Sequence, residues 1–186
     1  MDFQSKWNNK HRERMKQLTE PASNPRLMRL ASYLNGGNAL DFACGLGGNS
    51  LFLSRKGYNV QAIDISDVAI DYIKDLALKN NLSIDARMAD LTSLDQHSWD
   101  NQSFDMIVVT YYLDRRVFPL IKKILKAGGY FFMETYYQAP TTAKQGVSDQ
   151  YKLKPKELLN EFGDWQVLYY EENEHERRQT IFCRKC

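Results

Sequence analysis

Short apolar segments alternate with amphipathic segments along most of the chain, and this alternation limits the fold more than any other feature. Five apolar segments predict strands: residues 39–42, 60–65, 84–88, 104–110 and 130–135. The run Met106-Ile107-Val108-Val109 contains no polar residue, which indicates a strand covered on both faces. We therefore predict an α/β fold with a mostly parallel sheet, right-handed crossovers and helices on both faces.

Amphipathic segments with recognisable starts predict the helices. Asn24 and Pro25 are typical of a helix cap and first turn, and apolar residues then recur at helical spacing up to Leu34. Ser66 can cap a helix whose apolar face begins at Ala69. Further helices are predicted at residues 49–56, 117–125 and 155–162. Residues 1–20 are polar and charged, which suits either a helix or an arm.

The last two predicted strands, residues 165–170 and 179–184, are separated only by the charged run 171–178. This connection is too short for a crossover helix, so we expect the two strands to pair as an antiparallel hairpin with the charged run as its loop.

The composition excludes several classes of protein. The chain has 186 residues, 43% of them hydrophobic and 26% charged, and its net charge is +2. This balance suits one globular domain and does not predict a nucleic-acid or membrane partner. No apolar run reaches the ~18 residues of a membrane span, and residues 1–16 lack the apolar segment of a signal peptide. We therefore expect a cytoplasmic protein.

The histidines and cysteines predict neither a metal site nor a disulfide framework. His11, His97 and His175 show no ligand spacing, and we expect solvated surface side chains. Cys183 and Cys186 form a single CxxC pair in the last four residues, for which two thiols on a frayed tail are the plainer interpretation. Cys44 lies beside glycines, and we expect it to pack in a tight turn rather than to react.

A glycine-rich turn follows the first predicted strand, in the sequence Asp41-Phe42-Ala43-Cys44-Gly45-Leu46-Gly47-Gly48. Glycine lets a backbone approach a ligand closely, and the start of the next helix offers unpaired N–H groups. Ligands of a parallel sheet bind at the carboxyl ends of its strands. The turn is therefore a candidate nucleoside site.

Two carboxylates strengthen this hypothesis. Asp64 ends the second strand, where a carboxylate can accept both hydroxyl groups of a ribose. Asp90 ends the third strand, where it can accept from an adenine amino group, with Ile65 and Leu91 as apolar walls. The plain alternative for each Asp is a turn or a helix cap.

NAD is the main competing ligand, because Gly45-Leu46-Gly47-Gly48-Asn49-Ser50 nearly fits the GxGxxG motif. Asp41 argues against NAD, since a buried acid repels a pyrophosphate, whereas it can accept from an α-amino group or from turn amides. A chain of 186 residues also leaves little room for the substrate domain of most dehydrogenases.

The same residues resemble a known family. The turn from Asp41 to Gly47, together with Asp64, Asp90 and Leu125-Lys126-Ala127-Gly128-Gly129, is similar to the motifs of class I methyltransferases that depend on S-adenosylmethionine (SAM). The resemblance extends from residue 26 onward and is closest to the small bacterial branch of tellurite-resistance methyltransferases. Ala43 and Ala127 depart from the pattern, since glycine and proline are usual there.

The resemblance implies a Rossmann-like seven-stranded sheet in the order 3-2-1-4-5-7-6, with strand 7 antiparallel, and SAM as the cofactor. Residues 26–186 are then the methyltransferase domain, and residues 1–25 are an arm or helix that covers the cofactor site. Arg26 is expected to pair with the carboxylate of SAM. The residues expected to contact the cofactor are Arg26, Asp41, Ala43, Gly45, Gly47, Asn49, Asp64, Ile65, Asp90, Leu91 and Thr110.

The methyl acceptor is expected beyond the fourth strand. Tyr111 and Tyr112 are candidates to flank the methyl group, with core packing as the equal alternative. Arg115, like Arg116, can attract an anionic acceptor, although arginines at a helix start are often only solvated. The N/D-P-P-Y/F motif of base-methylating enzymes is absent from this segment, which argues against a nucleic-acid substrate.

The fifth strand contributes a further carboxylate. Glu134 can hold the acceptor or pair with an arginine, and residues 138–150 can close over the site as a lid.

The sequence therefore predicts methyl transfer from SAM to a small acceptor by in-line displacement, without a metal. A thiol, a chalcogen oxyanion or a small acid would suit this chemistry. The alternative is a catalytically degenerate nucleoside-binding subunit with a regulatory or partner role. We expect a monomer or a weak dimer.

Overall fold

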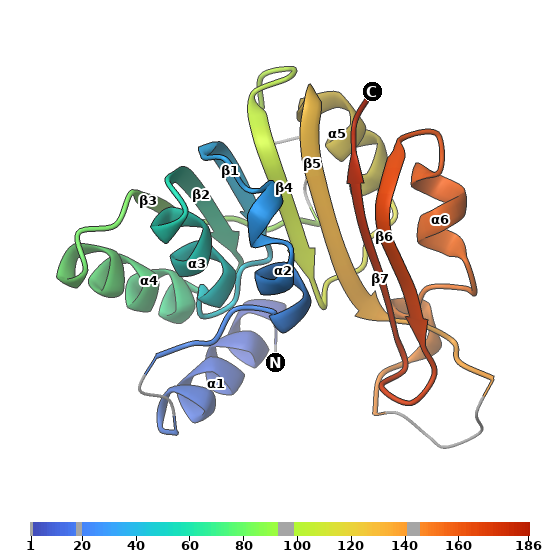
Figure 1. The fold of residues 1–186 in the computed structure, drawn as a ribbon. Helices are drawn as coiled ribbons and strands as arrows, with labels where there is room; N and C mark the ends of the chain where they lie inside the picture. Colours follow the sequence, from blue (N-terminus) through green and yellow to red (C-terminus); the bar gives the residue numbers. More distant parts are fainter. Residues whose placement is uncertain (1, 18–19, 93–98, 141–145) are drawn as a thin grey trace. The chain divides into compact units, whose positions relative to one another are not determined.

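The computed structural model describes residues 2–17, 20–92, 99–140 and 146–186 (Figure 1). The chain forms two compact units, an N-terminal unit of residues 1–98 and a C-terminal unit of residues 99–186. The strand order is β3-β2-β1-β4-β5-β7-β6, which confirms the predicted α/β fold and strand order. The division into residues 1–25 and 26–186 stays a prediction.

The N-terminal unit contains three parallel strands and their helices. Its elements are α1 (Phe3–Met15), α2 (Pro25–Arg29), η1 (Ala31–Tyr33), β1 (Gly37–Phe42), α3 (Gly48–Arg55), β2 (Tyr58–Asp64), α4 (Asp67–Lys79) and β3 (Ile84–Met88). Strand β2 pairs in parallel with both β1 and β3. The buried face of α4, with Ile70 and Ile73, packs on Ala62 and Ala86 of the strands, and Cys44 packs against this cluster as predicted.

The helix predicted up to Leu34 is shorter in the structure. Asn24 caps it as expected, because its Oδ1 accepts from the N–H of Arg26 at 2.9 Å and of Leu27 at 3.3 Å. The helix ends at Arg29, since Leu30 N–H bonds to Leu27 three residues back and a 3₁₀ turn follows. Capping of α4 by Ser66 is confirmed, because its hydroxyl accepts from Ala69 N–H at 3.1 Å.

The C-terminal unit contains four strands in the order β4-β5-β7-β6. Its elements are β4 (Phe104–Thr110), α5 (Val117–Ile124), β5 (Leu125–Tyr136), η3 (Asp149–Tyr151), α6 (Glu157–Phe162), β6 (Gln166–Asn173) and β7 (Arg178–Arg184). Strands β4 and β5 are parallel, and β7 is antiparallel to both β5 and β6, which confirms the terminal hairpin. Strand β5 begins earlier than predicted, because Leu125 follows α5 directly and already pairs with Phe104.

The charged run 171–178 is not the loop that the sequence predicted. Strand β6 continues through Glu171 and Glu172 to Asn173, and β7 begins at Arg178. These charged residues stay in the hairpin because they face polar partners in register, such as Thr180 opposite Glu171. Cys183 is likewise buried inside β7 rather than placed on a frayed tail.

The two faces of β5 differ in character because side chains alternate along a strand. On one face, Phe131 contacts Phe162 of α6 at 4.7 Å between ring centroids, and Phe118 of α5 meets the same Phe162 ring at 5.5 Å. Helices α5 and α6 therefore cover this face (Figure 1). Glu134 lies on the opposite face, in register with Thr180 of β7.

Residues 22–24 pack against the start of α3, which follows the glycine turn. The side-chain oxygen Oδ1 of Asn49 accepts from the Ser23 hydroxyl at 3.0 Å and from the Asn24 N–H at 2.9 Å. A Cβ atom on Gly48 would lie 2.1 Å from the carbonyl oxygen of Ala22. Gly48 is therefore required by a contact between two backbone segments.

Gly48→Ala should lower the free energy of unfolding by about 1–3 kcal/mol, because residues 22–24 must move away from α3. Gly146→Ala is the control, since nothing lies within 4 Å of a Cβ atom at that position. Urea unfolding of both variants checks this expectation, and equal stabilities would show that the 22–24 segment does not pack on α3.

Candidate functional site

The carboxylate of Asp64 fixes the glycine turn. Asp64 ends β2 and is 7% exposed. Its Oδ2 accepts from Gly45 N–H at 2.8 Å, and its Oδ1 accepts from Ser66 N–H at 2.9 Å. Both are charge-assisted bonds, which are stronger than neutral ones. Asp64 therefore has the turn role that the sequence left open, while Ser66 is the cap of α4. The ribose-binding role stays a prediction that fits, because two carboxylate oxygens have about four acceptor positions.

The backbone of the turn is left-handed at several positions, including Ala43 (φ 58°), Gly45 (φ 54°) and Gly47 (φ 81°). Glycine adopts this conformation without strain, whereas for other L-residues it costs roughly 1–2 kcal/mol. Ala43, which replaces the usual glycine of the family, is therefore a strained residue directly after β1. Strain of this kind concentrates at functional sites.

The glycines of the turn differ in what they face. A Cβ atom on Gly47 would lie 2.6 Å from Cγ1 of Ile73 in α4, so Gly47 is required by packing within the protein. A Cβ atom on Gly45 would lie 3.4 Å from Cε1 of His11 in α1. The sequence analysis explained both glycines by the approach of a ligand, and for Gly47 the observed reason is the contact with Ile73.

Asp41 supplies an unmet acceptor beside the turn. It is fully buried in β1, and its Oδ2 accepts from the Ser50 hydroxyl at 2.6 Å. Its Oδ1 has no hydrogen-bond partner among the described residues. Burial raises the pKa of the Asp41 carboxyl to about 7, against the opposing effect of the Ser50 hydroxyl. A cationic ligand group that donates to Oδ1 would stabilise the ionised form.

The other predicted cofactor residues have varied surroundings. Asp90 is exposed, and its Oδ1 accepts from the N–H and the hydroxyl of Thr92 at 2.9 and 2.7 Å, as in a turn. Asn49 holds residues 23–24, which gives it a structural role. Of the remaining predicted residues, Leu91 is buried, and Arg26, Ile65 and Thr110 are half-buried. Their contacts with the cofactor stay predictions.

His11 is a residue that the sequence analysis misjudged. It was expected on the surface, but it is 1% exposed and lies beside the turn, with its ring stacked on Trp7 at 5.7 Å. Residues 1–20 suited either a helix or an arm, so the four-residue spacing of His11 with Trp7 and Met15 could not be assigned to a buried helix face from the sequence. His175 is exposed as expected, and His97 lies outside the described residues.

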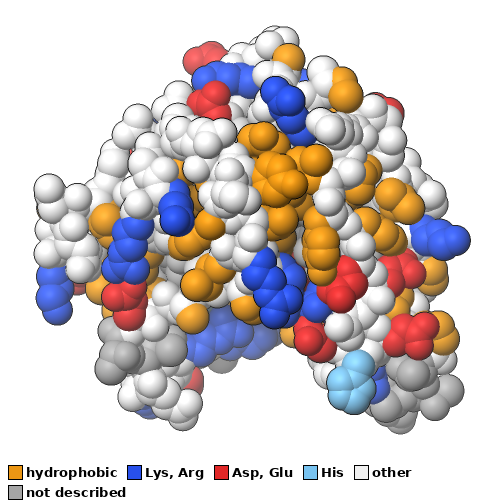
Figure 2. Space-filling model, viewed as in Figure 1, with side chains coloured by type: hydrophobic (Ala, Val, Ile, Leu, Met, Phe, Trp, Pro, Cys, Tyr) orange, Lys and Arg blue, Asp and Glu red, His pale blue; other side chains and the backbone are white. Residues whose placement is uncertain are grey.

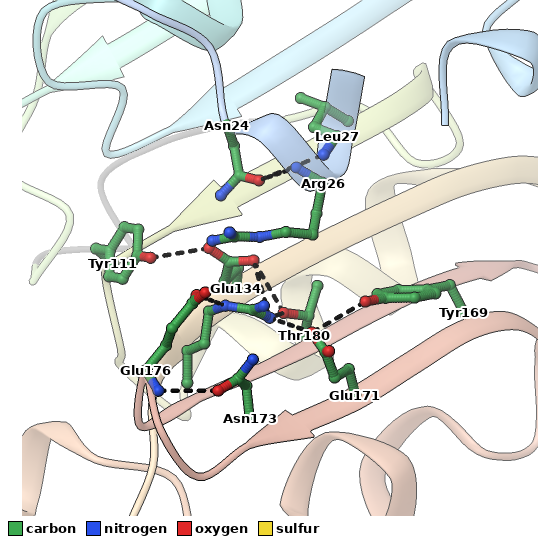
Figure 3. A network of polar contacts seen from close by, with 11 residues as sticks. Asn24, Arg26, Leu27, Tyr111, Glu134, Tyr169, Glu171, Asn173, Glu176 and Thr180 are labelled. Atoms are coloured by element: carbon green, nitrogen blue, oxygen red, sulfur yellow. Dashed lines mark hydrogen bonds and ion pairs between the residues drawn. The ribbon is translucent and has the colours of Figure 1, made fainter. Parts of the chain in front are cut away.

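In the C-terminal unit, a buried polar network surrounds Glu134 (Figure 3). Glu134 is fully buried near the carboxyl end of β5. Its Oε1 accepts from the Tyr111 hydroxyl at 2.8 Å, and its Oε2 accepts from the Thr180 hydroxyl at 2.9 Å. Arg178 lies 3.7 Å from the same Oε2. The alternative that Glu134 pairs with an arginine is therefore confirmed, and its contact with the acceptor stays a prediction.

Arg178 joins this network to the hairpin. It is 4% exposed, and its guanidinium group forms ion pairs with Glu171, at 2.5 Å, and with Glu176. Glu171 also accepts from the Tyr169 hydroxyl at 3.0 Å. The sequence analysis missed Arg178 because it placed the charged run in a loop, whereas the register of β6 and β7 brings these charges together.

Tyr111 is the exposed end of the network. Its side chain is 46% exposed, so the core-packing alternative is wrong for this residue. Its backbone is left-handed (φ 54°), and its N–H donates to the carbonyl oxygen of Glu134 at 2.8 Å. Two bonds to Glu134 and a ring contact with Tyr136 at 5.1 Å therefore hold a strained residue at the end of β4. Tyr112 is half-buried.

Arg115 and Arg116 are both engaged with carboxylates. The Arg115 guanidinium binds Glu157 in a bidentate ion pair, with Nε–Oε1 at 2.5 Å and Nη2–Oε2 at 2.8 Å. Arg116 binds Asp114 two residues away. Arg115 therefore ties the segment after β4 to the start of α6, and its predicted contact with an anionic acceptor has no support here. The predicted lid at residues 138–150 lies partly outside the described residues.

Within the described ranges, no three His, Cys, Asp or Glu side chains gather as a metal site. No helix in these ranges is long and apolar enough to cross a membrane. The Cys44 thiol has a pKa raised well above its usual value, chiefly by burial and further by Asp41 and Asp64. A thiol with such a pKa is a poor nucleophile, in line with the expected packing role.

The fold and the turn can now be set beside known proteins. The family model described as tellurite resistance protein TehB matches residues 10–181. The chain belongs to the TehB family. This finding confirms the resemblance to class I SAM-dependent methyltransferases and supports SAM as the cofactor. Binding of SAM at the glycine turn stays a prediction.

Three similar proteins illustrate the relationship. Hemagglutinin 1 of Eikenella corrodens is 32% identical over 142 residues, which is 72% of this chain and 45% of that protein. The probable S-adenosyl-L-methionine-dependent methyltransferase TehB of Haemophilus influenzae (strain ATCC 51907 / DSM 11121 / KW20 / Rd) is 29% identical over 148 residues, 76% of this chain and 50% of that protein. The crystal structure of TehB from Haemophilus influenzae has a TM-score of 0.79 at 24% identity, with 92% of this chain and 65% of that chain covered. The chain thus spans about half the length of these curated relatives.

The buried Asp41 carboxylate, with one oxygen that lacks a hydrogen-bond partner among the described residues, predicts that the stability of the protein falls as the pH rises. The folded pKa of about 7 lies above the ordinary value of 3.8, so folding favours the protonated form. The contribution of Asp41 to stability is full below pH 4 and is lost as the pH rises through 7.

Asp41→Asn should therefore unfold with a free energy like that of wild type near pH 4 and about 1–3 kcal/mol higher at pH 8, because no charge is buried. Asp71→Asn, at an exposed position of α4, is the control and should follow wild type at both pH values. Thermal melts between pH 4 and 8 measure this difference. Parallel wild-type and Asp41→Asn profiles would contradict the assignment.

Proposed function

We propose that this chain transfers the methyl group of SAM to a small acceptor by in-line displacement. Membership of the TehB family supports the reaction class. SAM supplies a methyl group on a sulfonium, which is already activated for transfer. The protein then has to bind the cofactor, align the acceptor and exclude water, and a metal is not needed for these tasks.

The N-terminal unit would hold the cofactor. The observation that carries this proposal is the pair of buried carboxylates at the carboxyl ends of β1 and β2. Asp41 has one oxygen without a partner, which suits an ammonium group, and Asp64 holds the turn while keeping capacity to accept from ribose hydroxyls. These two acceptors therefore fit the ammonium group and the ribose hydroxyl groups of SAM.

The C-terminal unit would contact the acceptor through Tyr111. Its phenol donates to the buried Glu134, and a phenol oxygen can accept a further hydrogen bond. Because Glu134 is fully buried, it would act on an acceptor only through Tyr111, as a positioning residue. A thiol or a small acid that donates a hydrogen bond to the Tyr111 oxygen fits this arrangement, and a chalcogen oxyanion fits in its protonated form.

Three further expectations stay predictions: that the protein binds neither nucleic acid nor a membrane, that it is cytoplasmic, and that it is a monomer or a weak dimer. Both basic and acidic side chains occur on the face drawn in Figure 2, in keeping with the small net charge of +2. A mixed surface of this kind supports a small acceptor rather than a polyanion.

Tyr111→Phe should lower kcat for the acceptor roughly tenfold or more, because the acceptor loses its hydrogen-bond partner. Binding of S-adenosylhomocysteine should stay unchanged. A screen of thiols, chalcogen oxyanions and small acids with labelled SAM supplies the acceptor and the rates.

Thr180→Val is the matched control, since it also removes one hydrogen bond to Glu134 but leaves the exposed phenol in place. Both variants should lose about 1–3 kcal/mol of stability, and only Tyr111→Phe should lose most of its turnover. Equal turnover in the two variants would overturn the role of Tyr111. Cofactor binding without turnover of any acceptor would favour the nucleoside-binding regulatory subunit.

A further inference from the structure

The two buried side chains of helix α1 are polar. Its described buried residues are Asn8 and His11, which lie on one face because they are three residues apart. A helix that packs on a domain usually does so through an apolar stripe. Asn8 has a protein partner, since its Oδ1 accepts from the Ser66 hydroxyl at 2.6 Å. This bond anchors α1 at the start of α4, directly after Asp64.

His11, the other buried residue of this face, lacks a hydrogen-bond partner among the described residues at either ring nitrogen, although its side chain is 1% exposed. The ring lies at the glycine turn, where a Cβ atom on Gly45 would be 3.4 Å from Cε1. A buried polar group without a partner is costly and calls for an explanation, such as a ligand.

Asp41 also has a buried atom without a hydrogen-bond partner among the described residues, its carboxylate oxygen Oδ1. Its Oδ1 is a buried acceptor four residues before Gly45, and its charge favours an ammonium ligand. Burial lowers the pKa of the His11 imidazole and therefore favours its neutral form. Neutral imidazole has one N–H donor and one acceptor nitrogen. An α-amino acid presents an ammonium and a carboxylate on the same carbon, and these are the two groups that Asp41 and His11 can satisfy.

We propose that His11 binds the amino-acid end of SAM, with its ring N–H donating to the carboxylate while Asp41 accepts from the ammonium. This inference rests on the proposed function, because it needs SAM to be the ligand of the turn. It assigns to α1 a direct part in cofactor recognition, and it explains why His11 is buried at the turn without a hydrogen-bond partner among the described residues.

Two ligands separate this role from a structural one. S-adenosylhomocysteine has the amino-acid end, whereas 5′-methylthioadenosine keeps the nucleoside and the sulfur but lacks that end. His11→Phe should bind S-adenosylhomocysteine about tenfold or more weakly, and 5′-methylthioadenosine within twofold of wild type. His11→Gln, which keeps a donor, should recover part of the lost affinity. His175→Phe, at an exposed position, is the control and should change neither affinity.

Calorimetric titrations and thermal melts of the ligand-free proteins give the readouts. The melting temperature of His11→Phe should not fall, because the substitution removes no hydrogen bond within the protein. Unchanged binding of S-adenosylhomocysteine, or an equal loss for both ligands, would overturn the inference. If His11→Phe fails to fold, the same comparison with His11→Gln decides. Failure of the wild type to bind S-adenosylhomocysteine would instead refute the proposed function.

Discussion

The candidate cofactor site depends on the two hydrogen bonds that the Asp64 carboxylate accepts. One oxygen holds the N–H of Gly45 and the other holds the N–H of Ser66, so a single side chain fixes the turn after β1 relative to the start of α4. The rest of the arrangement follows from this position. Ser66 caps α4 and binds Asn8, which brings α1 against the turn and buries His11 beside Gly45. The carboxylate that is expected to bind a ribose therefore also holds the glycine turn in place.

Buried charge has a comparable role in the C-terminal unit. Glu134, Thr180 and Glu171 lie in register across β5, β7 and β6. Arg178, at the start of β7, forms ion pairs with both carboxylates. A buried ion pair of this kind adds little net stability, but loss of one partner is costly, so it fixes a single arrangement. The result is that Tyr111, at a strained position, is held by its backbone and by its hydroxyl.

Local sequence patterns were sufficient for the elements that depend on local chemistry. The apolar run at 104–110 and the cap at Ser66 are confirmed, because continuous burial and N-capping leave direct marks on neighbouring residues. The glycine turn and Asp64 were placed by the same reasoning. The family resemblance supplied the strand order, which spacing alone could not.

The errors concern residues whose surroundings are set by distant parts of the chain. Arg178 was placed in a loop because a run of charges usually indicates solvent. In the structure, the pairing of β7 with β5 and β6 brings Glu134 and Glu171 to Arg178, and Glu176 of the hairpin loop is its third carboxylate. His11 lies on a helix that the sequence left unassigned, since residues 1–20 suited either a helix or an arm, so its spacing with Trp7 and Met15 did not predict burial. The ion pair of Arg115 with Glu157 joins residues 42 positions apart, so local sequence could not predict it.

The central claim is that the glycine turn between β1 and α3 binds SAM rather than NAD. Calorimetric titration of the wild-type chain with S-adenosylhomocysteine and, separately, with NAD tests this claim most directly. The account predicts micromolar binding of S-adenosylhomocysteine, roughly −8 kcal/mol, and no comparable binding of NAD. Tight binding of NAD with no response to S-adenosylhomocysteine would contradict it.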